Sequence, residues 1–309
     1  MMTVSVIIPT RNESHDIRDT IEACLRLEGP LKEVIVVDDS DDDTPDIVSE
    51  YVGEKVKLIH REVNRNICCG ARIEGIRAAL GEVCILLNAD AHLNEHFLTQ
   101  ILPHYDNGAD YLVVESKALN MDNVWGQYVQ AIQYDLLLDD PSPNWSEGFS
   151  CRTAVAITVK DWPGDYPVPF CRDYLLVPAL KAVGAKGHFD RSIIVEHIVP
   201  TGVAHWNNYV YRGTFLAPNF YFIRHRSMSY VAARSIVKCL YEFGRLSTIV
   251  WPLVTAVRFT RHLKCARIQS SIISMLGAVI VTHSAMGVGN IKGLWRLCKT
   301  ITALRLGVK

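Results

Sequence analysis

The stretch VSVIIPTRNE at residues 4–13 decides the fold. Its first five positions are mostly apolar and rich in β-branched side chains, which is typical of a strand buried in a parallel sheet. Pro9 ends this run, and polar residues follow it at once. The stretch therefore predicts a buried strand that delivers a polar loop to one edge of a sheet.

The same pattern repeats along the chain. Further apolar runs at 33–37, 56–59 and 83–87 alternate with expected helices at 14–27, 44–51 and 70–80. Such alternation predicts a Rossmann-like α/β fold, with a mostly parallel sheet flanked by helices and ligands at the carboxyl ends of its strands. Beyond residue 110 the pattern is less regular, with a strand expected at 152–159, a helix at 173–183 and mostly helices from 206 onward.

The strand ends carry polar residues that narrow the chemistry. They read PTRNE at 9–13, DDS at 38–40 and NADAH at 88–92. The sequence has neither a G-x-G-x-x-G fingerprint after the first strand nor a G-K-[ST] loop, which argues against dinucleotide and P-loop enzymes. Carboxylates repel a bare diphosphate, so a phosphorylated ligand at this edge requires a cation.

Charge divides the chain into two parts. Residues 1–225 contain 19 Lys and Arg against 32 Asp and Glu, whereas residues 226–309 contain 13 against 1. The basic part also holds two stretches free of charged residues, at 246–257 and 269–291. Basic charge next to long apolar runs favours anionic lipid over nucleic acid as the partner. We therefore predict a catalytic domain at 1–225 and a membrane-associated helical region at 226–309.

Interfacial or re-entrant helices fit these two stretches better than clean membrane spans. The first stretch is too short to cross a bilayer, and the second is diluted by Ser, Thr, Gly and His283. The amino-terminal residues read as a strand and not as a signal peptide. The catalytic part is thus expected at the cytoplasmic face of the cell membrane.

Four motifs in order resemble family 2 of the nucleotide-sugar glycosyltransferases. They are residues 4–13, VVDDS at 36–40, the segment from Gly70-Ala71-Arg72 to Gly81-Glu82, and NAD at 88–90. The resemblance is close over about residues 4–95 and looser over 145–225. Beyond residue 225 it extends only to the general character of the sequence. It implies a GT-A fold and, from the polyprenyl-phosphate sugar transferases among its members, a membrane setting.

The resemblance also assigns nucleotide-sugar contacts to matching positions. Asp39 would hydrogen-bond the base, as an ionised carboxylate can with the N–H edge of uracil or guanine. The whole set that the resemblance implies is Pro9, Thr10, Arg11, Glu13, Asp39, Arg72, Asn88, Ala89 and Asp90. Since one aspartate can serve either base, both UDP- and GDP-sugars remain open.

A metal site is implied at the D-x-D motif of the family, which reads Asn88-Ala89-Asp90 in this chain. Asp90 keeps the position of the direct ligand, while Asn88 can ligate only weakly through its carbonyl oxygen. His92 would project to the same side as Asp90 if the segment stays extended, although a histidine of a surface loop fits the sequence equally well. His197, after the run at 193–195, is a further candidate, and the set would suit Mn²⁺ or Mg²⁺.

The acceptor side rests on a looser match. Asp173 corresponds to the family's base, which deprotonates an acceptor hydroxyl, but Arg172 replaces the expected glutamate. A lipid phosphate would need no base, and Arg152, Arg172 and Arg212 could then hold it. Each arginine also fits a surface charge or a clamp on the donor diphosphate.

These observations predict a metal-dependent inverting glycosyltransferase that moves a sugar from a nucleoside diphosphate to a lipid-linked or glycan acceptor. Two alternatives remain. Asn88 and Arg172 both depart from the acidic pattern, which fits a catalytically weak protein that binds sugar nucleotides or lipid. A sugar nucleotidyltransferase would share the sheet, but it would carry a basic glycine-rich loop after the first strand.

Overall fold

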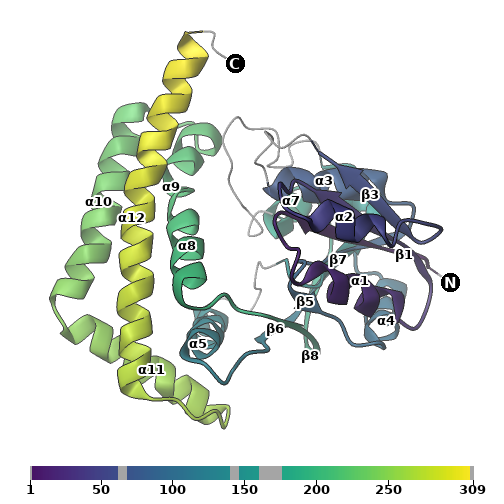
Figure 1. The fold of residues 1–309 in the computed structure, drawn as a ribbon, viewed down its shortest axis with the longest axis horizontal. Coiled ribbons are helices and arrows are strands. Elements are labelled where there is room, and N and C mark those ends of the chain that lie inside the picture. The colour runs from purple at the N-terminus through teal and green to yellow at the C-terminus, as the bar shows by residue number, and fades with distance from the viewer. Residues whose placement is uncertain (1, 62–67, 140–145, 160–175, 307–309) are drawn as a thin grey trace. The chain divides into compact units, whose positions relative to one another are not determined.

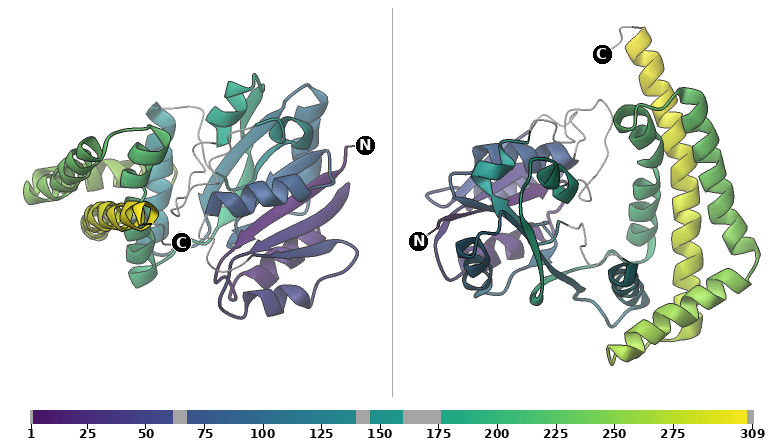
Figure 2. Two further views of the ribbon diagram at one scale, coloured as in Figure 1. Left: turned by 90° about the horizontal axis from the view of Figure 1, so that it is seen from above. Right: turned by 180° about the vertical axis from the view of Figure 1, so that it is seen from behind.

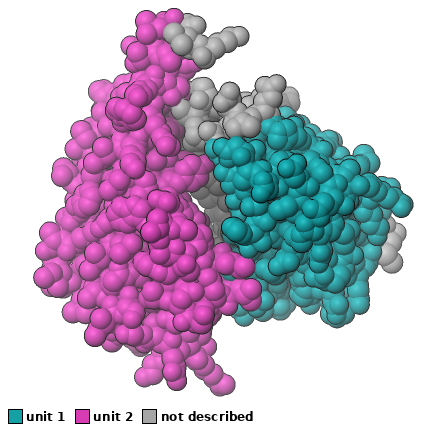
Figure 3. Space-filling model, viewed as in Figure 1, with its two compact units in different colours: residues 1–117, 142–165, 172–197 teal, residues 118–141, 166–171, 198–309 magenta. Residues whose placement is uncertain are grey.

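The computed structural model describes residues 2–61, 68–139, 146–159 and 176–306. The chain forms two compact units, shown in Figure 3. Unit 1 comprises residues 1–117, 142–165 and 172–197, and unit 2 comprises 118–141, 166–171 and 198–309. Each unit is described separately below.

Unit 1 is built on an eight-stranded sheet with the order β3-β2-β1-β4-β7-β6-β8-β5 (Figure 1). The first four strands in this order are parallel, whereas β7 pairs antiparallel with β4 and β6, and β5 pairs antiparallel with β8. The sheet is therefore mixed, parallel in one half only. Its strands are β1 Val4–Thr10, β2 Leu31–Asp38, β3 Val56–His60, β4 Val83–Leu86, β5 Ala91–His92, β6 Tyr111–Ala118, β7 Phe149–Arg152 and β8 Gly187–His197.

The alternation of side chains along β1 creates a core on each face of the sheet. Val4, Val6 and Ile8 pack into the cluster formed with α1, α2 and α4, whereas Ile7 packs into the cluster formed with α3, α6 and α7. A strand covered on both faces must be apolar at nearly every position, which explains the run in the sequence. The helices are α1 Ile17–Leu25, α2 Thr44–Ser49, α3 Cys68–Ala78, α4 Phe97–Asp106, α6 Thr153–Ala156 and α7 Leu176–Ala182.

The predicted elements up to residue 87 are confirmed, and one later strand is wrong. The strand expected at 152–159 lies instead at Phe149–Arg152 and is followed directly by the short helix α6. Residues 154–157 read AVAI, which fits a helix as well as a strand. Pro9 also lies within β1 and does not end it, since β1 continues to Thr10.

Unit 2 is helical. The helices α8, α10 and α12 run side by side in Figure 2. Gly213 of α8 and Gly289 of α12 allow this close packing, because a Cβ on Gly289 would lie 2.2 Å from the Val210 carbonyl oxygen. The helices are α5 Val124–Asp139, α8 Gly202–Gly213, α9 Leu216–Pro218, a π-helical turn at Asn219–Ile223, α10 Met228–Ser247, α11 Val250–Cys265 and α12 Ile272–Arg305.

The boundary between the units differs from the one expected at residue 225. Both α5 and α8 belong to unit 2, and α12 packs against each of them. Helix α12 has 34 residues and a mean hydropathy of 1.7 over its most apolar window, so it is long and apolar enough to cross a membrane. Only 39% of that window is buried within the protein.

A buried glutamate ties β1, β2, β3 and the segment after α3 together at the amino ends of the strands. Glu33 Oε1 accepts hydrogen bonds from the Ser5 hydroxyl at 2.8 Å and the Leu80 amide at 2.6 Å, and Lys57 Nζ lies 2.5 Å from Oε2. Burial alone would raise the pKa of Glu33, but these hydrogen bonds outweigh it and lower that pKa. The carboxylate therefore stabilises the fold at neutral pH, and this contribution is lost as the pH falls through its lowered pKa.

Replacing Glu33 by alanine should lower the free energy of unfolding by about 3 kcal/mol, because it leaves buried donors without an acceptor. Glu50→Ala is the matched control, since Glu50 pairs with Arg18 at 2.7 Å but is exposed. That change should cost less than about 1 kcal/mol. Denaturant unfolding of both variants measures the difference, and equal losses would contradict a structural role for Glu33.

Candidate functional site

The carboxyl ends of β1 and β2 are joined by a set of hydrogen bonds. The Thr10 hydroxyl donates to Asp38 Oδ1 at 2.7 Å, and the Asn12 amide donates to Ser40 Oγ at 2.8 Å. Asn12 adopts a left-handed backbone with φ of 58°, which asparagine tolerates better than most residues. Its side chain then accepts from the amide of Asp41 at 3.0 Å. These contacts fix the loop that presents Asp39.

Asp39 is a buried carboxylate with one oxygen unused. Its Oδ2 accepts from Arg61 Nη1 at 2.8 Å, whereas Oδ1 has no partner among the described residues. Burial raises the pKa of Asp39, and the charges of Arg61 and Arg11 oppose that rise. A buried acceptor without a donor is costly, so Oδ1 is ready to accept an N–H group from a ligand.

Asn88 after β4 takes part in a different network from the predicted one. Its Oδ1 accepts from Arg72 Nη2 at 2.7 Å, and its Nδ2 donates to Glu147 Oε1 at 3.3 Å. Arg72 is buried and also contacts Ser146 Oγ at 3.4 Å. The amide therefore works as an acceptor and a donor at once, which a carboxylate cannot do. One of the two lone pairs of its oxygen is used by Arg72, and the weak metal ligation expected of Asn88 stays a prediction.

Asp90 lies where carboxylates accumulate. The pKa of Asp90 is raised to about 6, chiefly by burial; His197 opposes this rise, and Glu147 and Asp16 add to it. His197 is buried, with Nδ1 3.2 Å from the Ser116 hydroxyl, which leaves Nε2 as the other ring position. The charged form of Asp90 is disfavoured in these surroundings, and a fixed imidazole lies next to it. Together the carboxylate and the imidazole form a donor set that fits a divalent cation.

His92 is not brought to the same side as His197. Residues 89–90 form a turn in which the Ala91 amide donates to the Asn88 carbonyl at 3.1 Å, so the segment is not extended as the prediction required. In the β5–β8 ladder Ala91 pairs with His197 and His92 pairs with Glu196. Paired side chains share a face and neighbours alternate, so His92 and His197 lie on opposite faces.

The predicted arginines are distributed differently from the expectation. Arg11 is exposed and close enough to Asp39 to affect its pKa. Arg152 pairs with Val83 at the amino end of β4, and its guanidinium donates to the carbonyls of Ala109 and Tyr105 at 3.0 and 2.5 Å. It lies at the opposite end of β4 from Asp90, where its guanidinium holds the segment between α4 and β6.

The acceptor-side predictions remain predictions. Arg212 lies on α8 in unit 2, where it donates to Asn208 Oδ1 at 3.0 Å and stacks on Tyr209. Asp173 and Arg172 lie outside the described residues. Of the remaining predicted contacts, Pro9 lies in β1, the Glu13 amide donates to Thr44 Oγ1 at 2.9 Å, and Ala89 is buried in the turn before β5.

Sequence reasoning missed three residues that shape this edge. Arg61 follows β3 as the polar residues follow β1, β2 and β4, so the same strand-end argument applied to β3 would have found it. Ser146 and Glu147 carry no such signal. They reach Arg72 and Asn88 from a segment more than fifty residues away in the sequence.

A sequence model of the family described as glycosyl transferase family 2 matches residues 5–159, half of the chain. This match covers the strand ends that carry Asp39, Arg72, Asn88 and Asp90. The chain belongs to glycosyl transferase family 2. The chain spans about a quarter of the length of the first curated relatives that it matches.

Curated relatives agree with this assignment. The chain is 27% identical over 177 residues to the Escherichia coli UDP-Glc:alpha-D-GlcNAc-diphosphoundecaprenol beta-1,3-glucosyltransferase WfgD, and this match covers 56% of the chain and 67% of WfgD. It is 35% identical over 94 residues to a Staphylococcus epidermidis poly-beta-1,6-N-acetyl-D-glucosamine synthase. That match covers 30% of this chain and only 23% of the synthase.

Solved structures resemble the fold over nearly the whole chain. The Pyrobaculum calidifontis mannosyltransferase PcManGT, in complex with GDP-Man and Mn²⁺, has a TM-score of 0.59 at 14% identity, covering 96% of this chain and 88% of its own. Residues 1–349 of Staphylococcus aureus TarS, in complex with UDP-GlcNAc, give 0.53 at 16%, covering 94% and 92%. At such identities the likeness shows the fold, which is the GT-A fold.

Replacing Asn88 by aspartate should lower kcat/KM about tenfold. The new carboxylate would lose the hydrogen bond to Glu147 and repel it, at a cost of about 1.4 kcal/mol. The assay is nucleoside diphosphate release from whichever donor proves active. Asn94→Asp, at an exposed position whose oxygen accepts from the His96 amide, is the matched control and should keep full activity. Higher activity in Asn88→Asp would instead mark a degenerate metal motif.

Proposed function

We propose that the glycosyltransferase transfers a sugar from a UDP- or GDP-sugar to a lipid-linked acceptor at the membrane, in a metal-dependent, inverting reaction that serves the synthesis of a cell-envelope glycan. The observation that carries this proposal is a pair of acids at one edge of the sheet, of which Asp39 is buried and Asp90 is half-buried. Asp39 offers an unused acceptor atom, and Asp90 offers a carboxylate in need of a cation. The relatives and neighbours named above support nucleotide-sugar use.

The spacing of the two acids fits an extended nucleotide. Asp39 follows β2 and Asp90 follows β4, with β1 between them, so they are separated by two strand spacings or about 10 Å. In this arrangement the base lies at Asp39 Oδ1 and the diphosphate lies toward Asp90. Arg11, which is exposed next to Asp39, is placed to contact the ribose or the phosphates.

Asp90 and His197 are the residues that would hold the cation. A divalent ion there would stabilise the negative charge that develops on the leaving diphosphate. Asp90 supplies an oxygen and His197 a nitrogen, a donor set that suits Mn²⁺ at least as well as Mg²⁺. Ser116 keeps the imidazole in one orientation through its contact with Nδ1. The acceptor attacks the anomeric carbon from the side opposite the diphosphate, which inverts that centre.

Unit 2 supports a lipid acceptor. Large apolar side chains are exposed on α10, α11 and α12, among them Leu240 at 65%, Val250 at 65% and Ile273 at 83%. A soluble surface rarely carries so many, whereas a surface that contacts lipid needs them. The excess of Lys and Arg after residue 225 adds attraction to anionic headgroups. We place the enzyme at the cytoplasmic face of the membrane on this basis.

A cavity of about 330 Å³ within unit 2 combines apolar walls with positive charge. Arg245 lies over the rings of Tyr241 and Trp251, at 3.8 and 4.6 Å from their centroids, and has no ion pair among the described residues. A cation held by aromatic rings beside an apolar cavity suits a lipid phosphate. The cavity is lined by Tyr128, Ile132, Tyr209, Lys238, Glu242, Arg245, Trp251, Thr255, Arg258, Phe259, Thr282, His283 and Met286.

The test is nucleoside diphosphate release from a panel of UDP- and GDP-sugars by detergent-solubilised enzyme with Mn²⁺ and a membrane-lipid extract. We expect release from one donor that requires both metal and extract. Asp90→Ala should abolish it, whereas Asp106→Ala, an exposed acid at the end of α4, should not. Release that needs no metal would contradict the proposed role of Asp90, and no release from any donor would favour a binding protein.

The acceptor is tested separately from the donor. Arg245→Gln should reduce the extract-dependent release and leave slow hydrolysis of the donor by water unchanged. The exposed Arg261 of α11 provides the matched control, since Arg261→Gln removes an equal charge elsewhere on unit 2. Equal effects of the two variants would show that the general charge of unit 2 matters and the cavity does not.

A further inference from the structure

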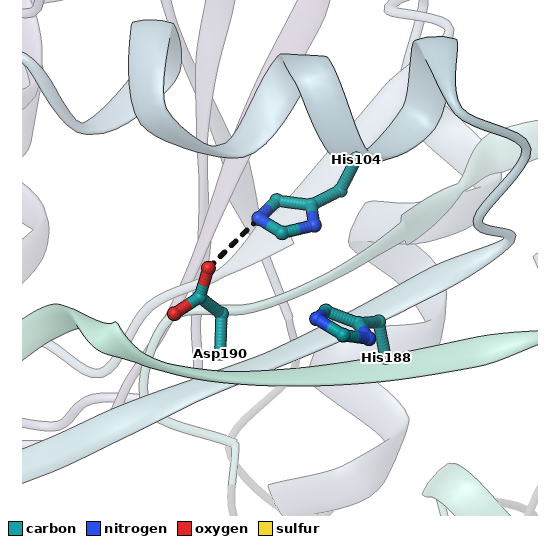
Figure 4. Close-up of side chains that lie close together, drawn as sticks. All are labelled: His104, His188 and Asp190. Carbon is teal, nitrogen blue, oxygen red and sulfur yellow. Dashed lines mark ion pairs between the residues drawn. The ribbon is translucent and has the colours of Figure 1, made fainter.

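Three metal-ligating side chains meet on unit 1, away from the proposed catalytic edge. His104 comes from the last turn of α4, and His188 and Asp190 come from the first half of β8 (Figure 4). One ligand atom from each lies within 4.8 Å of the other two. His104 Nε2 is 3.0 Å from Asp190 Oδ2, and the two imidazole rings are stacked with centroids 5.0 Å apart.

The local structure orients these groups toward a common point. His188 and Asp190 are two residues apart on one strand, so their side chains project from the same face toward α4. Asp190 Oδ1 accepts from the amide and hydroxyl of Ser192 at 2.8 and 2.6 Å, which fixes the carboxylate and leaves Oδ2 directed at His104. In metal sites, a hydrogen bond to the oxygen that does not bind the metal commonly orients the carboxylate, so that its other oxygen faces the ion.

The chemistry of the set selects the class of ion. Two imidazole nitrogens and one carboxylate oxygen suit Zn²⁺ and similar transition metals, and they suit Ca²⁺ or Mg²⁺ poorly. In tetrahedral coordination the ligand atoms lie about 3.4 Å apart. The His104–Asp190 distance is already near this value, and a small rotation of the exposed His188 ring would bring the third ligand in.

This cluster is separate from the other acidic groups of unit 1. Asp190 and His197 are seven residues apart on β8, or about 23 Å along an extended strand. A second group, Glu28, Glu95 and His96, is fully exposed, and its single imidazole is paired with Glu28 at 2.8 Å. Exposed acids of that kind are common without a metal, so that group serves as a control.

We propose that His104, His188 and Asp190 form a second metal site, which binds Zn²⁺ or a similar transition-metal ion and cross-links α4 to the beginning of β8. The site holds together parts of the chain that are 84 residues apart in the sequence, on the side of the sheet where β8 lies. Its role is to stabilise unit 1. It does not depend on the proposed catalytic metal or on the donor sugar.

The test is titration of Zn²⁺ into the metal-free full-length enzyme by calorimetry, with thermal unfolding measured in parallel. We expect His188→Ala to bind one equivalent of Zn²⁺ fewer than the wild type. Zn²⁺ should also no longer increase the Tm of this variant. His188 is exposed, so the variant should fold with an unchanged Tm in EDTA. His96→Ala and Asp90→Ala should both retain that equivalent.

A purely structural ion pair between His104 and Asp190 gives a different result. Asp190→Asn would then lower Tm equally with and without Zn²⁺. With a metal site, Asp190→Asn should also weaken binding of that equivalent at least tenfold and abolish its effect on Tm. Unchanged Zn²⁺ stoichiometry and an unchanged Tm increase in His188→Ala would overturn the proposal.

Discussion

The parallel pairing of β1 with β2 on one side and β4 on the other is the constraint on which the site depends. Thr10 pairs with Asp38, and Ile7 pairs with Leu86, so the segments after the three strands emerge at one edge. The hydrogen bond from Thr10 to Asp38 extends this pairing beyond the backbone. A shift of register by one residue would turn Val4, Val6 and Ile8 away from their core and would displace both acids.

That constraint explains why the first half of the chain could be predicted from its sequence. The runs at 4–8, 33–37 and 83–87 are buried on both faces, and such strands have few alternatives. Asp39 and Asp90 could be placed at one edge for the same reason. What could not be predicted are contacts between distant segments, such as those of Ser146 with Arg72 and Glu147 with Asn88. The error at 152–159 arose because a short AVAI segment fits a strand and a helix equally.

Asn88 stands where the family motif has its first aspartate, and its contacts offer a physical reason for the difference. An aspartate there would bring a third carboxylate next to Glu147 and Asp90, where burial, with a smaller contribution from Glu147, already raises the pKa of Asp90 to about 6. The amide instead bridges Arg72 and Glu147 and so organises the edge without adding charge. Asp90 is then the one carboxylate of the motif, and it is the residue that we propose to hold the cation.

We propose that Asp90 holds a divalent cation that helps to bind the nucleotide. The most direct measurement is Mn²⁺ binding by electron paramagnetic resonance, with and without UDP or GDP, in a His188→Ala background that removes the α4–β8 cluster. We expect Asp90→Asn to weaken Mn²⁺ binding at least tenfold and Asp106→Asn to leave it unchanged. Because the pKa of Asp90 is about 6, protons should compete with the metal, and affinity in the parent should fall between pH 7 and pH 5. Equal Mn²⁺ affinity in the parent and Asp90→Asn at pH 7 would contradict the account.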